Sequence, residues 1–374
     1  MANMKATKKG NLYRVIVLIL VATVLVCAVG FAADGWQNSP APDSGKTEEN
    51  NGNTDENKDG GKTGDTPTNK AEEPVIYIPE FTDALTGLET SERLAKTRYL
   101  AFVTENTQYL YGMSSASVVF EFPFENGKTR YLVYQNSPEN LGKIGALAPS
   151  REYMTSVTKS FDALPVTVGS DDPAEVSFES GVATLDLARS DTFAYTENTV
   201  FRYTNGDLIS AALEASGISL VQTEKNALPY DFYSFGKEPS PSGKSASTVL
   251  LPYSASNETE LYYQAETGVY SYSKCGNRKI DTLNGKNIVF RNVFLLFADA
   301  TTYEKADGAT TLLDTDTSGS GYYIRDGVMT EFTWKNIDGK MVFTDTDGNR
   351  LKVNRGNSYF SFFKSSMKKS VTIQ

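Results

Sequence analysis

The sequence predicts an α+β protein: an N-terminal α/β domain with a mixed sheet and a C-terminal, mainly antiparallel β domain, preceded by a transmembrane helix and a disordered linker. Three observations support this fold class. A continuous apolar run near the N-terminus is followed by a long polar segment. The next part of the chain mixes period-two and helical hydrophobic patterns. The last part consists of short alternating segments separated by Asp-Gly turns.

The N-terminal apolar run extends over residues 15–33 and would span about 28 Å as a helix, close to the thickness of a bilayer core. Basic residues precede the run, and no cation follows it until Lys46. The positive-inside rule therefore leaves residues 1–11 in the cytoplasm and exports the rest. We expect a single-pass protein of the cell membrane whose globular domains are extracytoplasmic.

Three interpretations of residues 12–33 are open. The length of the run favours a retained transmembrane anchor. Small residues before the end of the run also allow a signal sequence that is cleaved after Ala32. Cys27 could instead carry a lipid, although the apolar run continues past it and bulky Val26 precedes it.

Composition divides the remainder of the chain. Residues 34–74 are rich in acidic residues, Gly, Asn, Thr and Ser, and cannot bury enough apolar surface to offset their ordering entropy. We expect a disordered acidic linker there. Alternating apolar patterns then predict an N-terminal α/β domain over residues 75–235, a linker over 236–247, a C-terminal β domain over 248–366, and a tail over 367–374.

Local patterns predict the main elements of both domains. Asn126-Gly127 is typical of a two-residue hairpin loop. Gly217 predicts the end of a helix. The expected strands cover 98–103, 118–124, 129–134, 321–325, 328–334, 340–344 and 357–363, and the expected helices cover 150–161 and 206–216.

Composition also excludes several kinds of chemistry. The formal net charge is −10, which argues against a nucleic-acid partner. The chain has no histidine, so Ser-His-Asp and Cys-His catalysis within one chain are excluded. Cys27 and Cys275 are the two cysteines and form no disulfide framework. Residues 345–349 resemble a calcium loop, but Gly356 stands where a closing acidic residue is required, so we expect a β-turn, no metal and no cofactor.

Two features could bind a ligand. A two-residue loop at Asn126-Gly127 would place Glu121 and Arg130 on one face as diagonal neighbours. They would form either a cross-strand ion pair or a charged patch. Arg151 lies at the start of a helix, where the helix dipole opposes a cation. It would either bind an anion or pair with Glu152, Asp162 or Glu121.

Several motifs occur in a recognisable order: Ala84–Leu88, Gly112–Ala116, Phe120-Glu121 with Gly127–Tyr131, Ile144-Gly145 with Ser150–Tyr153, Ala265–Tyr270, Lys286–Val289, Ser318–Gly321, Arg325–Val328, Thr333–Lys335 and Asp345–Gly348. Over residues 80–365 the chain resembles the YerB-like bacterial lipoprotein family. The resemblance implies two domains that are exported and attached to a membrane, but no reaction. By motif position it gives Glu121, Thr129, Arg130 and Arg151 as candidate ligand-binding residues, and no catalytic residue. The family's lipobox is missing here.

These observations favour a non-enzymatic, membrane-tethered binding or scaffold protein of the bacterial cell envelope. Its expected partners are the membrane, through the N-terminal helix, and an envelope protein or a cell-wall glycan. The alternative is a carboxylate-dependent envelope enzyme in which Glu121 acts as acid or base and Arg130 and Arg151 hold an anionic substrate. Convergence of these three side chains on one concave site would favour the alternative.

Overall fold

The computed structural model describes residues 76–374 except 173–181, 189–190, 198–199, 224–227, 306–307 and 338. The predicted cytoplasmic tail, transmembrane segment and acidic linker lie outside the described residues. None of the described helices has the length and apolar character needed to cross a bilayer.

Helices are few and short. The α-helices are α2 (Glu92–Ala95), α3 (Glu152–Ser156) and α4 (Gly206–Ser216), and the 3-10 turns are η1 (Met113–Ser115), η2 (Glu125–Gly127), η3 (Val157–Phe161) and η4 (Ser365–Ser370).

Strands make up most of the described chain. The first part of the chain contributes β1 (Tyr99–Glu105), β2 (Val118–Pro123), β3 (Thr129–Gln135), β4 (Ile144–Leu147), β5 (Ala163–Thr167), β6 (Leu185–Asp186), β7 (Tyr195–Glu197), β8 (Phe201–Thr204) and β9 (Asp231–Phe232). The second contributes β10 (Lys244–Ser245), β11 (Thr248–Ser254), β12 (Asn257–Gln264), β13 (Val269–Lys274), β14 (Asn277–Arg278), β15 (Val289–Phe290), β16 (Asn292–Ala298), β17 (Ala300–Lys305), β18 (Gly308–Leu313), β19 (Ser318–Arg325), β20 (Val328–Ile337), β21 (Lys340–Asp345), β22 (Lys352–Val353), β23 (Ser358–Lys364) and β24 (Thr372–Ile373).

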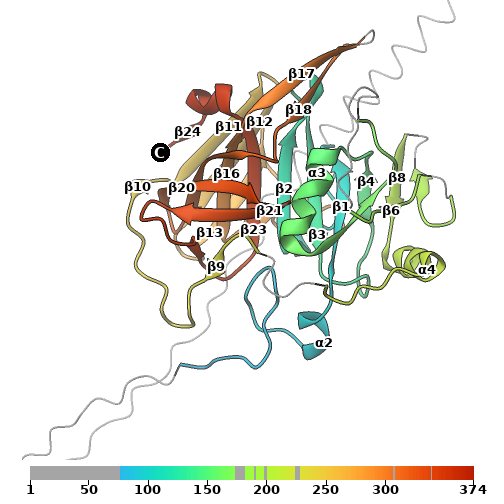
Figure 1. The fold of residues 1–374 in the computed structure, drawn as a ribbon, viewed down its shortest axis with the longest axis horizontal. Helices are drawn as coiled ribbons and strands as arrows, with labels where there is room; N and C mark the ends of the chain where they lie inside the picture. The colour runs from blue at the N-terminus through green and yellow to red at the C-terminus, as the bar shows by residue number, and fades with distance from the viewer. Residues whose placement is uncertain are drawn as a thin grey trace, which may run out of the picture. The chain divides into compact units, whose positions relative to one another are not determined.

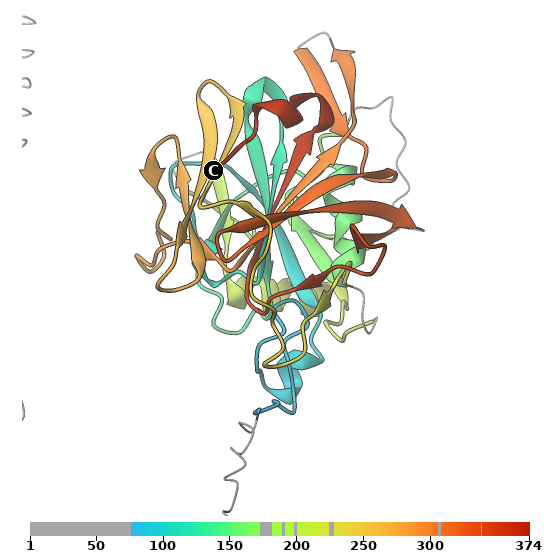
Figure 2. The ribbon, with the colours of Figure 1, turned by 90° about the vertical axis from the view of Figure 1, so that its left-hand side faces the viewer.

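One large sheet runs through both parts of the chain, in the order β10-β20-β19-β16-β23-β2-β3-β1-β4-β8-β7. Strand β23 is parallel to β16 on one side and to β2 on the other. The last long strand is therefore hydrogen-bonded to the first part of the chain, and the strands of both parts converge in the view of Figure 2. The first part has a mixed sheet because β5 is parallel to β1, whereas β1, β2 and β3 are antiparallel.

A row of aromatic rings crosses the junction between the two parts. Phe120, Phe360 and Phe294 lie side by side on β2, β23 and β16. Their ring centroids are 4.5 and 4.3 Å apart, and the rings are nearly parallel. All three side chains are fully buried. Cross-strand aromatic contacts of this kind stabilise the pairing of neighbouring strands.

The large sheet is covered on both faces. On one face, α3 lies over the first part of the sheet (Figure 1), and Tyr153 and Met154 of this helix pack in one hydrophobic core with Phe120 and Phe122. On the other face, a second, antiparallel sheet with the order β14-β13-β12-β11-β24 packs through a separate core. The hairpin β17–β18 projects beyond the sheets (Figure 1). Because both faces are covered, Glu121 on β2 and Arg130 on β3 are both buried.

The predicted helices are confirmed, with one change of geometry. Helix α4 starts where the Asn205 side chain accepts a hydrogen bond from Leu208 N, and it ends at Gly217 in the left-handed conformation. The helix predicted over 150–161 begins as α3 and continues as the 3-10 turn η3. Hydroxyl groups of Thr155, Ser156 and Thr158 donate to carbonyls three residues earlier, which fits the tighter winding.

Candidate functional site

The β2–β3 hairpin sets the direction of the candidate side chains. Phe124 faces Lys128 across a three-residue loop, in which Asn126 and Gly127 both have positive φ. Glu121 therefore pairs with Tyr131, and Arg130 pairs with Phe122. The predicted two-residue loop is one residue too short. Because side chains alternate along a strand, that shift places Glu121 and Arg130 on opposite faces, so the predicted cross-strand ion pair is wrong.

Glu121 is fully buried and points toward the second sheet. Its Oε1 lies 2.7 Å from Nζ of Lys274 on β13. Its Oε2 accepts hydrogen bonds from Thr259 Oγ1 at 2.8 Å, Tyr359 OH at 2.6 Å and Tyr272 OH at 3.3 Å. Burial raises the pKa of the carboxyl group, but the charge and hydrogen bond of Lys274, together with the hydrogen bond of Tyr359, outweigh it and hold the pKa below its ordinary value. Glu121 is thus a carboxylate saturated with partners.

The tyrosines around Glu121 are permanent hydrogen-bond donors. Burial, reinforced by the negative charge of Glu121, raises the pKa of Tyr272 and of Tyr359 well above the usual value. Tyr131 OH lies 2.8 Å from Tyr272 OH and extends the network. The network joins strand β2 of the first part to β12, β13 and β23 of the second, so the buried ion pair links the two parts of the chain.

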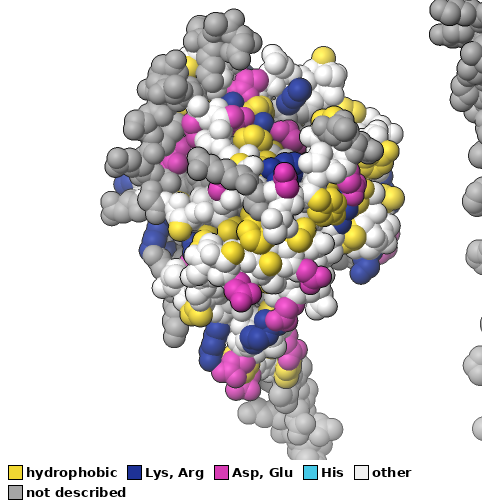
Figure 3. All heavy atoms as spheres, turned by 90° about the vertical axis from the view of Figure 1, so that its right-hand side faces the viewer, with side chains coloured by type: hydrophobic (Ala, Val, Ile, Leu, Met, Phe, Trp, Pro, Cys, Tyr) yellow, Lys and Arg dark blue, Asp and Glu magenta, His cyan; other side chains and the backbone are white. Residues whose placement is uncertain are grey.

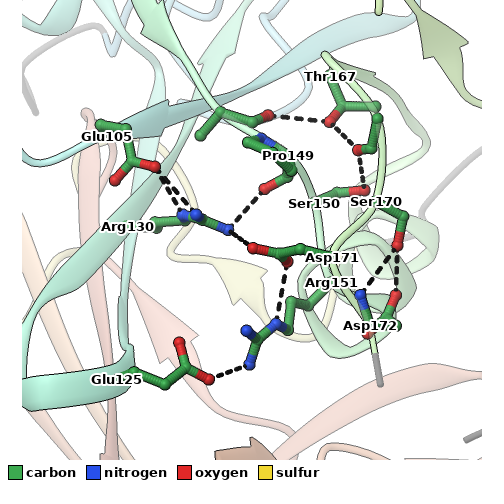
Figure 4. Close-up of polar contacts among 12 residues, drawn as sticks. Glu105, Glu125, Arg130, Pro149, Ser150, Arg151, Thr167, Ser170, Asp171 and Asp172 are labelled. Carbon is green, nitrogen blue, oxygen red and sulfur yellow. Dashed lines mark hydrogen bonds and ion pairs between the residues drawn. The ribbon is translucent and has the colours of Figure 1, made fainter. Parts of the chain in front are cut away.

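Arg130 and Arg151 lie on the other face and share one carboxylate (Figure 4). Asp171 accepts from Arg130 Nη1 at 2.7 Å and from Arg151 Nε at 3.0 Å. Arg130 also lies 3.0 Å from Glu105, and Arg151 lies 2.5 Å from Glu125. Both arginine side chains are nearly buried. The structure therefore brings these two predicted residues together, with partners that were not predicted.

The guanidinium groups also contact one aromatic ring. Arg130 Cζ lies 3.8 Å and Arg151 Cζ 4.2 Å from the ring centroid of Phe124. Burial opposes the charge of Arg151, but the hydrogen bond to Glu125 and the charge of Asp171 raise the pKa of its guanidinium. Each arginine is thus fixed by protein carboxylates, and neither presents a free charge to a ligand.

Thr129 lies in the wall of an open cleft of about 860 Å³, which we call the hairpin cleft. The loop of the β2–β3 hairpin forms one side, and the turns at the ends of β11 and β13 form another. Lys274, the partner of Glu121, and Glu105, a partner of Arg130, also line it. Thr129 Oγ1 accepts from Asn106 Nδ2 at 2.8 Å, and Asn257 Nδ2 donates to Gly127 O at 2.9 Å. Amide groups from both parts of the chain therefore meet in this cleft.

The hairpin cleft carries more positive than negative charge. Its lining cations are Lys128, Arg202, Lys274 and Lys279, against the single carboxylate of Glu105. Elsewhere charges are mixed: on the face shown in Figure 3, basic side chains lie beside acidic ones. The cleft thus differs in charge from an acidic protein as a whole.

Residues 345–349 form a turn, as predicted. Asp345 Oδ1 accepts from the backbone N of Asp347 at 3.0 Å and of Asn349 at 2.9 Å, and Gly348 has a φ of 85°. Side-chain acceptance from residues two and four positions ahead is typical of a turn closed by aspartate.

Comparison with known proteins decides the family. Residues 85–219 match the N-terminal domain, and residues 249–360 the C-terminal domain, of the "Protein of unknown function (DUF3048)" family. The chain is 29% identical over 275 residues to "Putative lipoprotein YerB" of Bacillus subtilis strain 168, which covers 69% of this chain and 79% of that protein. The chain belongs to the YerB-like family. The predicted resemblance is thereby confirmed.

The fold of the family also agrees with a solved structure. The crystal structure of the YerB protein from Bacillus subtilis has a TM-score of 0.66 and 24% sequence identity to this chain, and covers 79% of it and 100% of the solved chain. At this identity the likeness shows the fold alone. The family description assigns no reaction.

Proposed function

We propose that this protein is an extracytoplasmic, membrane-attached binding protein of the bacterial cell envelope, and that the hairpin cleft is its binding site. The carrying observation is the cleft itself: both parts of the chain line it, and the buried ion pair of Glu121 and Lys274 holds its two sides together. Ligand sites commonly form at such junctions between domains. The lipoprotein name of the Bacillus subtilis relative supports a location outside the cytoplasm.

The geometry favours binding over carboxylate catalysis. Glu121 is ionised, bonded to four partners and fully buried, so it has no proton to give and no substrate can reach it. Arg130 and Arg151 neutralise protein carboxylates instead of holding a substrate anion. The three residues do not converge on one site. Thr129 belongs to the wall of the hairpin cleft, but its side chain is almost fully buried and bonded to Asn106, so it supports the wall and does not itself present a group to a ligand.

The attachment to the membrane is proposed to use residues 12–33 as a retained helix. The supporting observation is the apolar run itself, with cations only on its N-terminal side nearby. Intact-mass analysis of the membrane-extracted protein tests this proposal. The unmodified N-terminus is the expected result, whereas a chain that begins at an acylated Cys27 would overturn the helical anchor.

Binding to the cell envelope can be tested by co-sedimentation of the full-length protein, kept in detergent, with purified cell-wall sacculi. Ser256 is exposed in the lining of the hairpin cleft, so Ser256→Trp should obstruct part of the cleft and lower the bound fraction about tenfold. Ser366 is exposed on η4, away from the cleft, and Ser366→Trp is the matched control. Equal binding of both variants, or no binding of the unaltered protein, would contradict the proposed function.

A further inference from the structure

The hairpin cleft differs in charge from three other depressions on the described residues. It has four cations and one carboxylate, whereas each of the other three has more carboxylates than cations. The whole chain has a formal net charge of −10. A negatively charged ligand is repelled by most of this surface and attracted to the cleft, because a concave site of one sign concentrates the field.

Two of the four cations remain available to a ligand. Lys274 is neutralised by Glu121, and Arg202 lies 3.2 Å from Asp191. Lys128 and Lys279, in contrast, form no ion pair with any other described residue. Lys128 is exposed at the tip of the β2–β3 hairpin, and Lys279 is half-buried just after β14. One uncompensated ammonium group therefore comes from each side of the cleft.

Between the charges the lining is rich in amide and hydroxyl groups. Gln108, Asn126 and Asn277 expose amides there, and Thr107 and Ser256 add hydroxyls. Amide side chains both donate and accept hydrogen bonds, and so match the hydroxyl groups of sugars or polyols. Lysine ammonium groups are compact point charges and do not require the planar geometry that arginine prefers in its anionic partners. The lining thus suits a chain that carries hydroxyls and separated negative charges.

We infer that the hairpin cleft binds a polyhydroxylated polyanion, a chain of sugar or polyol units that carries phosphate or carboxylate groups, with Lys128 and Lys279 at two of those groups. This inference rests on the proposed function and specifies the ligand class of the same site. An open cleft of about 860 Å³ accommodates a segment of an extended chain and leaves its ends outside.

The test measures binding of the full-length protein in detergent to three soluble polymers: poly(glycerol phosphate), polygalacturonate and neutral dextran. We expect binding to at least one acidic polymer, and the two acidic probes distinguish phosphate from carboxylate as the charged group. Added NaCl should weaken this binding because both lysines are accessible to solvent ions. Dextran should not bind measurably.

Substitutions of the two lysines test whether the polymer binds in the hairpin cleft. Lys128→Gln with Lys279→Gln should weaken binding of the acidic polymer by at least about tenfold. Lys335 is exposed on β20 and does not line the cleft, so Lys335→Gln is the matched control and should change the affinity less than about twofold.

Three results would overturn the inference: no binding of either acidic polymer, equal binding of dextran, or full binding by the double lysine variant. The sacculus experiment separates this failure from that of the proposed function. Sacculi bound in a Ser256→Trp-sensitive manner, without binding of either acidic polymer, would leave the binding function in place and remove the polyanion as its ligand.

Discussion

The two faces of the β2–β3 hairpin hold two different ionic systems. On one face, Glu121 has no contact with solvent and pairs with Lys274 within a network of hydroxyl donors. On the other face, Arg130 and Arg151 share Asp171, whose side chain remains 31% exposed. The ion pair of the first system crosses from one part of the chain to the other, whereas all the ion pairs of the second lie within the first part. The second system reaches the other part only through a long hydrogen bond of 3.4 Å from Arg151 Nη1 to Thr311 O.

Burial explains why these systems should behave differently. A buried charge that loses its partner keeps its full desolvation penalty, whereas water replaces part of the interaction at a partly exposed site. We therefore expect the Glu121 ion pair to stabilise the junction of the two parts. The ion pairs of Asp171 should stabilise only the local positions of the hairpin loop and the start of α3. Mutations on the two faces can test this division.

The largest effect is expected for Glu121→Gln. This change leaves Lys274 buried without a counter-charge, so the free energy of unfolding should fall by about 3–5 kcal/mol. Denaturant titration measures the change. The double variant Glu121→Gln/Lys274→Met should recover about half of the loss or more, because it removes both charges. A loss below about 1 kcal/mol for the single variant would show that the pair does not hold the junction.

The difference in unfolding free energy between the unaltered protein and Glu121→Gln should depend on pH. Neighbouring groups lower the pKa of Glu121 in the folded protein, so its stabilisation is present above the unfolded-state pKa and is lost as pH falls through the folded-state pKa. The gap in unfolding free energy between the unaltered protein and Glu121→Gln should be constant from about pH 6 to 8 and narrow below about pH 4. A gap that widens on acidification would contradict the assigned ionisation state.

A smaller effect is expected for Asp171→Asn. Both arginines lose charge neutralisation, but Glu105 and Glu125 remain beside them, and Asp171 is partly exposed. The expected loss is about 1–2 kcal/mol in the free energy of unfolding, again by denaturant titration. If this loss equalled that of Glu121→Gln, burial would not be what distinguishes the two faces.

The smallest effect is expected for Asp191→Asn. Asp191 pairs with Arg202, but its side chain is fully exposed. Surface pairs of this kind contribute little, so the unfolding free energy should stay unchanged within the error of the measurement. A larger change, measured under the same conditions, would mean that pairing itself, and not burial, sets the order of the three variants.

Local signals allowed some elements to be predicted and left others beyond reach. The apolar pattern and Gly217 predicted α4 with its observed bounds, and the structure adds Asn205 as the residue that caps its N-terminus. The hairpin register could not, because Asn126-Gly127 fits a two-residue loop as well as the three-residue loop that starts at Glu125. That single residue decided which face each candidate charge occupies.

The sequence did not predict side-chain and strand partners that are far apart along the chain. Lys274 is 153 residues from Glu121, and β23 pairs with β2 from the end of the chain. Neither hydrophobic periodicity nor a sequence motif predicts pairings between such distant residues. The position of Arg151 at a helix start predicted an anionic partner, but not the right one: its ion pairs are with Glu125 and Asp171, whereas Asp162 and Glu121, two of the predicted partners, pair with Arg98 and Lys274. A cation opposed by the helix dipole thus predicts that an anionic partner is present, but it does not identify that partner.

The accessibility of Cys275 tests the central claim most directly. This thiol is exposed at the hairpin cleft, and the other cysteine, Cys27, lies in the N-terminal apolar run. A membrane-impermeant maleimide should label the full-length protein in intact cells, and Cys275→Ser should abolish the label. Labelling of Cys275 only after the membrane is permeabilised would place the cleft inside the cytoplasm and contradict an extracytoplasmic binding protein.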